Sequence, residues 1–112
     1  MLMLFVLFFP IIEYRSFSID DYVDMLRPYS GLSPEHFVEF RENLQRFRME
    51  IFSRPQLAKQ YLVLSIESAR DMALYTRTAD SSVQYEVDEK INVIETDMKT
   101  ILEKEIKKYK PM

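Results

Sequence analysis

Apolar side chains recur every three or four residues along three long stretches of this chain, which is the spacing of one helix face. The first stretch starts at Ser33-Pro34-Glu35, with serine at the N-cap position and proline and an acid in the first turn. Its apolar positions are Phe37, Phe40, Leu44, Phe47 and Ile51. Arg54-Pro55 predicts the end of this helix and the start of the next, since proline interrupts a helix interior.

The second stretch carries a wide apolar stripe, and the third carries a narrower one. The wide stripe consists of Leu57, Ala58, Tyr61, Leu62, Ile66, Ala69, Met72 and Ala73. The small side chains of Ser65, Ala69 and Ala73 predict close approach of a neighbouring helix. The narrow stripe places Val83, Val87, Ile91, Ile94, Met98 and Ile101 at nearly heptad spacing.

We expect this narrow seam to pack on a neighbouring helix of the same chain, with pairing between subunits as the alternative. To about Lys108 the last helix would be about 39 Å long, longer than its neighbours. Eight apolar side chains are predicted to form the main helix interfaces: Phe37, Phe40, Leu44, Phe47, Val87, Ile91, Ile94 and Met98.

A shorter helix is predicted ahead of these three. Ser18 precedes Ile19-Asp20-Asp21, an N-cap followed by carboxylates that favour the positive end of the helix dipole. Ile19, Tyr22, Val23 and Leu26 share one face, Pro28 ends the helix, and residues 28–32 are typical of a turn. The fold class is therefore all-α, with residues 18–110 forming a small helical bundle of three long helices and one short helix.

The N-terminus differs from this body, because every one of its first twelve residues is apolar. The candidate anchor residues are Met1, Leu2, Leu4, Phe5, Val6, Leu7, Phe8, Phe9, Ile11 and Ile12. A helix of this length rises about 18 Å, less than the roughly 30 Å hydrocarbon core of a bilayer, and Pro10 would kink it. We therefore assign residues 1–17 to a hydrophobic anchor segment, with Glu13 and Arg15 near a membrane face. Docking into an apolar groove of a larger assembly and folding back onto the chain's own core are the alternatives.

Composition and charge exclude several classes of function. A net charge of −3 and a pI near 5.2 argue against a nucleic-acid-binding protein. The absence of cysteine excludes disulfides and thiolate metal sites, and the single glycine, Gly31, disfavours a glycine-lined phosphate loop. The basic stretch from Arg41 to Lys59 could meet anionic headgroups or an acidic partner, but a solvated face with internal ion pairs explains it more simply.

Candidate catalytic chemistry is sparse. His36 has no glutamate three residues before it, so the Glu-x-x-His pattern of carboxylate-bridged metal bundles is missing, and we expect a surface or capping histidine. Carboxylates at positions 20 and 24, and at 35, 39 and 42, share helix faces without a second cluster at ligand spacing. The sequence predicts a protein that is not an enzyme, with no catalytic residue, no cofactor and no metal ligand.

The apolar N-terminus leading into Tyr14-Arg15, followed by residues 32–44, resembles the small membrane-anchored helical proteins of nucleocytoplasmic large DNA viruses. The resemblance covers most of the chain as an arrangement, and the helix starting Pro34-x-x-Phe37-x-x-Phe40 carries it as a motif. It implies a virion component near the internal membrane, of the minor capsid or capsid–membrane linking type. It carries over no catalytic residue.

These observations together predict a non-enzymatic structural protein that tethers a membrane to a protein shell or complex, in the virus case a minor capsid component. The expected partners are membrane lipid and other structural, capsid-type proteins, with no nucleic acid, and an oligomer is allowed. The expected location is a membrane, in the virus case that of a virion. The alternative is a soluble helical adaptor whose apolar N-terminus docks into a partner protein of a multi-subunit complex.

Overall fold

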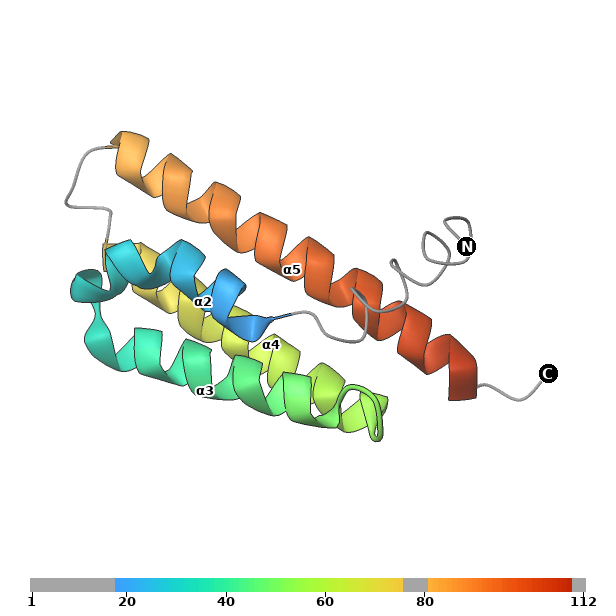
Figure 1. Cartoon of the computed structure of the whole chain (residues 1–112). Coiled ribbons are helices and arrows are strands. Elements are labelled where there is room, and N and C mark those ends of the chain that lie inside the picture. The colour runs from blue at the N-terminus through green and yellow to red at the C-terminus, as the bar shows by residue number, and fades with distance from the viewer. Residues whose placement is uncertain (1–17, 76–80, 110–112) are drawn as a thin grey trace, which may run out of the picture.

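The computed structural model describes residues 18–75 and 81–109, and its regular elements are all helices (Figure 1). In chain order they are α2 (Ile19–Leu26), the 3-10 helix η1 (Arg27–Leu32), α3 (Pro34–Glu50), α4 (Pro55–Ala73) and α5 (Ser81–Tyr109). The described part of the chain contains no strand, so the all-α prediction of three long helices and one short helix is confirmed. The predicted anchor segment, residues 1–17, lies outside the described residues.

The starts of α3 and α4 follow from proline. Pro34 and Pro55 each occupy the first turn, where the missing N–H costs nothing and the fixed φ suits a helix. Four residues, 51–54, then turn the chain from α3 into α4, and the amide of Arg54 donates to the Glu50 carbonyl at 2.7 Å. The predicted boundary at Arg54-Pro55 is therefore correct.

The predicted N-cap positions of Ser33 and Ser18 are confirmed, although neither serine makes a capping bond, and the predicted turn at residues 28–32 needs correction. Ser33 occupies the N-cap position with an extended backbone, but its hydroxyl makes no capping bond, because it lies 2.6 Å from Nδ1 of His36. Ser18 likewise makes no side-chain capping bond. The segment predicted as a turn, residues 28–32, is part of η1, because Pro28 stands in the first turn of that 3-10 helix and proline is tolerated there.

The core joins all four α-helices. All eight side chains predicted at helix interfaces are buried, and seven of them have no exposed surface: Phe40, Leu44, Phe47, Val87, Ile91, Ile94 and Met98. Phe37 is also buried, with Arg27 stacked 5.6 Å from its ring. The α5 seam is thus buried inside a single chain, as expected for packing on neighbouring helices.

The α4 helix lies between its two long neighbours in sequence and packs on both. Its small residues Ser65, Ala69 and Ala73 are buried, and the Ser65 hydroxyl donates to the Leu62 carbonyl at 2.8 Å. That bond satisfies the hydroxyl within its own helix, so it can be buried at little cost.

The long helices alternate in direction. Arg70, near the end of α4, pairs with Glu95 in α5, whereas Pro55, at the start of α4, lies near Ile106 toward the end of α5. The α3–α4 turn and the end of α5 therefore lie at the same end of the bundle (Figure 1). None of the helices in the described ranges is long and apolar enough to cross a membrane.

The short helix α2 lies along α5 in the opposite direction. The Tyr22 hydroxyl donates to Oδ2 of Asp97 at 2.9 Å, and Lys90 lies 5.9 Å from the ring centre of Tyr29. Burial, followed by the bond to Asp97, raises the pKa of Tyr22 to about 12. The start of α2 thus points toward the same end of the bundle as the end of α5 (Figure 1).

Candidate binding groove between α4 and α5

A groove of about 520 Å³ lies between α4 and the second half of α5. Its floor is aliphatic and is formed by Leu62, Val63, Ile66, Leu102 and Ile106. An apolar cleft between two helices is a common place for a ligand or a further helix to bind.

The rim of the groove is charged on both sides. From α4 come Lys59, Glu67 and Arg70, and from α5 come Glu95, Lys99 and Glu103. Each helix thus contributes both signs of charge. A binding partner that covers the floor would meet positive and negative charges in alternation along the rim. Such a rim contributes more to the specificity of binding than to its affinity.

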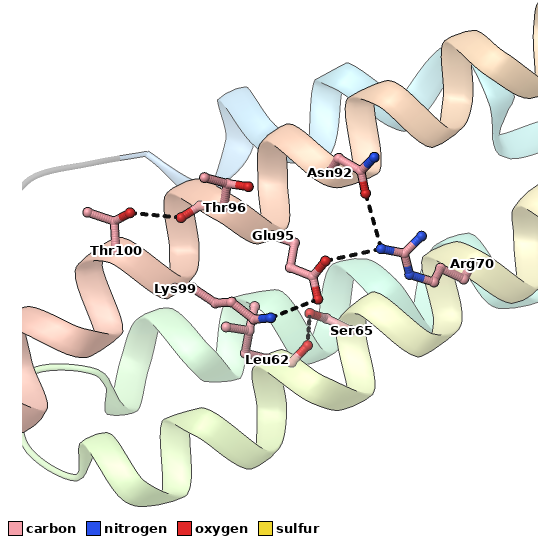
Figure 2. A network of polar contacts seen from close by, with 8 residues as sticks. All are labelled: Leu62, Ser65, Arg70, Asn92, Glu95, Thr96, Lys99 and Thr100. Carbon is pink, nitrogen blue, oxygen red and sulfur yellow. Dashed lines mark hydrogen bonds and ion pairs between the residues drawn. The ribbon is translucent and has the colours of Figure 1, made fainter.

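One end of the groove is closed by a polar network (Figure 2). Nη2 of Arg70 lies 3.0 Å from Oε1 of Glu95 and 3.2 Å from Oδ1 of Asn92, so this arginine bridges the two helices. Nζ of Lys99 lies 3.3 Å from the other oxygen of Glu95. These contacts hold α4 and α5 together at that level.

The other rim charges are open to solvent. Within the described ranges, Lys59, Glu67 and Glu103 have no ion-pair partner within 4.0 Å, and all three are exposed. Their charges are therefore solvated, and they line the part of the groove that lies beyond the Arg70–Glu95 ion pair.

The histidine and the carboxylates considered as catalytic or metal-binding residues in the sequence do not line this groove. His36 is half-buried, contacts the Ser33 hydroxyl, and its ring centre lies 6.0 Å from that of Tyr75. Glu39 accepts a bond from Ser68 at 3.3 Å, and Asp24 pairs with Arg27 at 2.9 Å. In the described part of the chain, no group of three such side chains could hold a metal ion.

The basic stretch on α3 and the start of α4 is solvated and internally paired. Arg46 and Arg48 stack on the rings of Tyr61 and Phe52, at 5.9 and 5.0 Å from the ring centres. Arg54 forms an ion pair with Glu50, and this hydrogen bond raises the pKa of Arg54. The guanidinium groups of Arg46 and Arg48 thus lie over aromatic rings, as in a cation–π contact.

Sequence reasoning missed the groove and one buried acid. Val63 was a usable signal, because it is an apolar residue between Lys59 and Glu67 on the polar side of α4. Glu105 is buried on α5 and pairs with Lys108 at 2.8 Å, and the signal for it was its position four residues after Ile101, which continues the apolar seam. The anchor residues, all within positions 1–12, lie outside the described residues.

Comparison with known proteins assigns no family: no family model, no curated protein and no solved structure matches this chain.

Proposed function

We propose that this protein is a non-enzymatic tether, which inserts its apolar N-terminus into a membrane and holds its helical body at that membrane for contact with other proteins. The observation that carries the proposal is the uninterrupted apolar run of residues 1–12, directly ahead of a charged, helical body. Such a run is stable in water only when lipid or protein covers it.

The way α2 is fixed supports the proposal. Ile19, Val23 and Leu26 bury one face of α2 in the core, and Tyr22 bonds to Asp97 on α5. The chain that precedes Ser18 is therefore joined to the body through a firmly packed helix. Force applied to the N-terminus would be transmitted to α5 through the Tyr22–Asp97 hydrogen bond.

The distribution of charge along the bundle supports it as well. Cations gather at the end where α3 turns into α4 and α5 ends, toward which the start of α2 also points (Figure 1). These cations are Arg46, Arg48, Arg54, Lys59, Lys104, Lys107 and Lys108, and they outnumber the acids of the same end, which are Asp20, Asp21, Glu50, Glu103 and Glu105. Acids prevail at the opposite end, among them Glu35, Asp71, Glu86, Asp88 and Glu89. An excess of cations at the end toward which α2 starts suits the anionic surface of a membrane.

The resemblance of the Pro34–Leu44 helix and its apolar N-terminal leader to viral membrane-anchored proteins supports a more specific form of the proposal. In that form the protein is a minor capsid component, and its body links the internal membrane of a virion to capsid-type proteins.

Membrane attachment is tested by alkaline carbonate extraction of membranes from cells that express the full chain. We expect the protein to stay in the membrane fraction, and complete release would contradict stable insertion. Deletion of residues 1–12 should abolish flotation with liposomes. If the full chain never floats with liposomes and the deletion instead abolishes binding to a protein partner, the alternative of a soluble adaptor is correct.

The basic end is tested with vesicles that contain anionic lipid. Lys107→Ala removes an exposed charge, and each basic residue near such a surface contributes about 1 kcal/mol, so partitioning should fall about fivefold. Lys90→Ala, at the acidic end, is the control and should leave partitioning unchanged; circular dichroism checks that loss of its contact with the Tyr29 ring leaves the bundle folded. Equal effects of the two substitutions would contradict this orientation of the bundle.

A further inference from the structure

The groove-facing side of α4 carries a self-complementary pattern. Lys59, Val63 and Glu67 follow one another at intervals of four residues, so they lie one above another on the same face of the helix. Val63 belongs to the groove floor and is nevertheless 50% exposed. A cation and an anion thus stand one helical turn on either side of an exposed apolar residue.

Two copies of such a face match when they meet antiparallel. If a two-fold axis passes beside Val63, the two valines come together, and Lys59 of each copy lies opposite Glu67 of the other. This is the condition for an isologous interface, in which the same patch on both copies is complementary to itself. A parallel arrangement would instead pair like charges.

We infer that the α4–α5 groove is occupied by α4 of a second copy of this chain, in an antiparallel homodimer. Because α5 also runs antiparallel to α4, the incoming helix runs parallel to α5 and covers the floor around Leu62 and Leu102. Leu62, Ile66 and Leu102 are already buried within the chain, so the apolar contact comes from the two Val63 side chains and the half-buried Ile106. The two Lys59–Glu67 pairs set the direction and register. This inference goes beyond the proposed function and does not depend on membrane insertion.

A disulfide cross-link gives the first test. The chain contains no cysteine, so Val63→Cys introduces its only thiol, and the two-fold axis places the two thiols of a dimer next to each other. Leu64→Cys is the matched control, because Leu64 is 46% exposed but lies about 100° away around the helix and outside the groove.

The full chain is oxidised in mild detergent, with micelles in large excess over protein, so that two chains rarely share a micelle by chance. We expect a covalent dimer from Val63→Cys at a yield at least about tenfold above that from Leu64→Cys. Equal yields, or no dimer from Val63→Cys, would overturn the inference.

Charge reversal gives an independent test in the Val63→Cys background. Lys59→Glu alone, or Glu67→Lys alone, places two pairs of like charges across the interface and should lower the dimer yield about tenfold. A mixture of the two variants restores opposite charges in both pairs, so cross-linking should return as a heterodimer that mass spectrometry identifies. If the mixture cross-links no better than either variant alone, α4 does not meet α4 in this register.

Discussion

Replacement of Tyr22 by phenylalanine tests how α2 is held on the bundle. The substitution keeps the ring and removes only the hydroxyl, which donates to Asp97 across 2.9 Å. A hydrogen bond to a charged group contributes about 1.5–3 kcal/mol to stability when it is well buried. Tyr22 is only half-buried, so we expect Tyr22→Phe to lower the free energy of unfolding by about 1 kcal/mol.

The pKa of Tyr22 reports this bond together with the burial of the ring, which is the larger cause of its rise. Its rise from 10.0 to about 12 corresponds to about 2.7 kcal/mol, and solvent screening of a half-buried group reduces this to about 1 kcal/mol. The folded state holds the phenolic proton more tightly than the unfolded state. The contribution is therefore complete below pH 10 and is lost as the pH rises from about 10 to about 12.

Thermal unfolding followed by circular dichroism measures this effect in the full chain. About 1 kcal/mol corresponds to a melting temperature about 4–8 °C lower for a domain of this size. Tyr85→Phe is the matched control, because Tyr85 is 72% exposed, and it should melt like the original protein. The gap between Tyr22→Phe and the original protein should close toward pH 12. A gap that is absent at pH 7, or unchanged at pH 12, would refute the role given to this bond.

Two further substitutions test the core and the groove. Phe40→Ala removes a fully buried ring between the helices and should cost about 3–5 kcal/mol, measured by urea unfolding, whereas the nearby Val38→Ala, at a residue 37% exposed, should cost far less. Similar losses would mean that the core is not centred on the predicted face of α3. Arg70→Ala breaks the exposed bridge to Glu95 and Asn92 and should cost under about 1 kcal/mol at low salt. That difference should shrink in 1 M NaCl, and a loss that salt does not change would point to packing of the arginine stem instead.

The helices of this protein could be predicted because proline and apolar spacing act locally. Pro34 and Pro55 determine where α3 and α4 begin through their own backbone geometry, without help from distant residues. The seam from Val87 to Met98 likewise follows from period alone, and it is buried throughout.

The features that prediction missed depend on contacts between side chains. The Ser33 hydroxyl can bond to a backbone amide of the first turn or to the ring of His36. The sequence does not indicate which of these two partners it takes. The groove exists because Val63 and Ile106, which are far apart in the sequence, line the same space from two consecutive helices. Only the packing of the whole bundle brings such residues together.

The bond between Tyr22 and Asp97 also provides an optical signal for the docking of α2. The chain contains seven tyrosines and no tryptophan, so its near-ultraviolet absorbance is dominated by phenol groups. During an alkaline titration, ionisation of Tyr22 is delayed to about pH 12 as long as α2 stays on α5. Phenolate absorbance near 295 nm would therefore report detachment of this helix without an added label, in solution or on a vesicle.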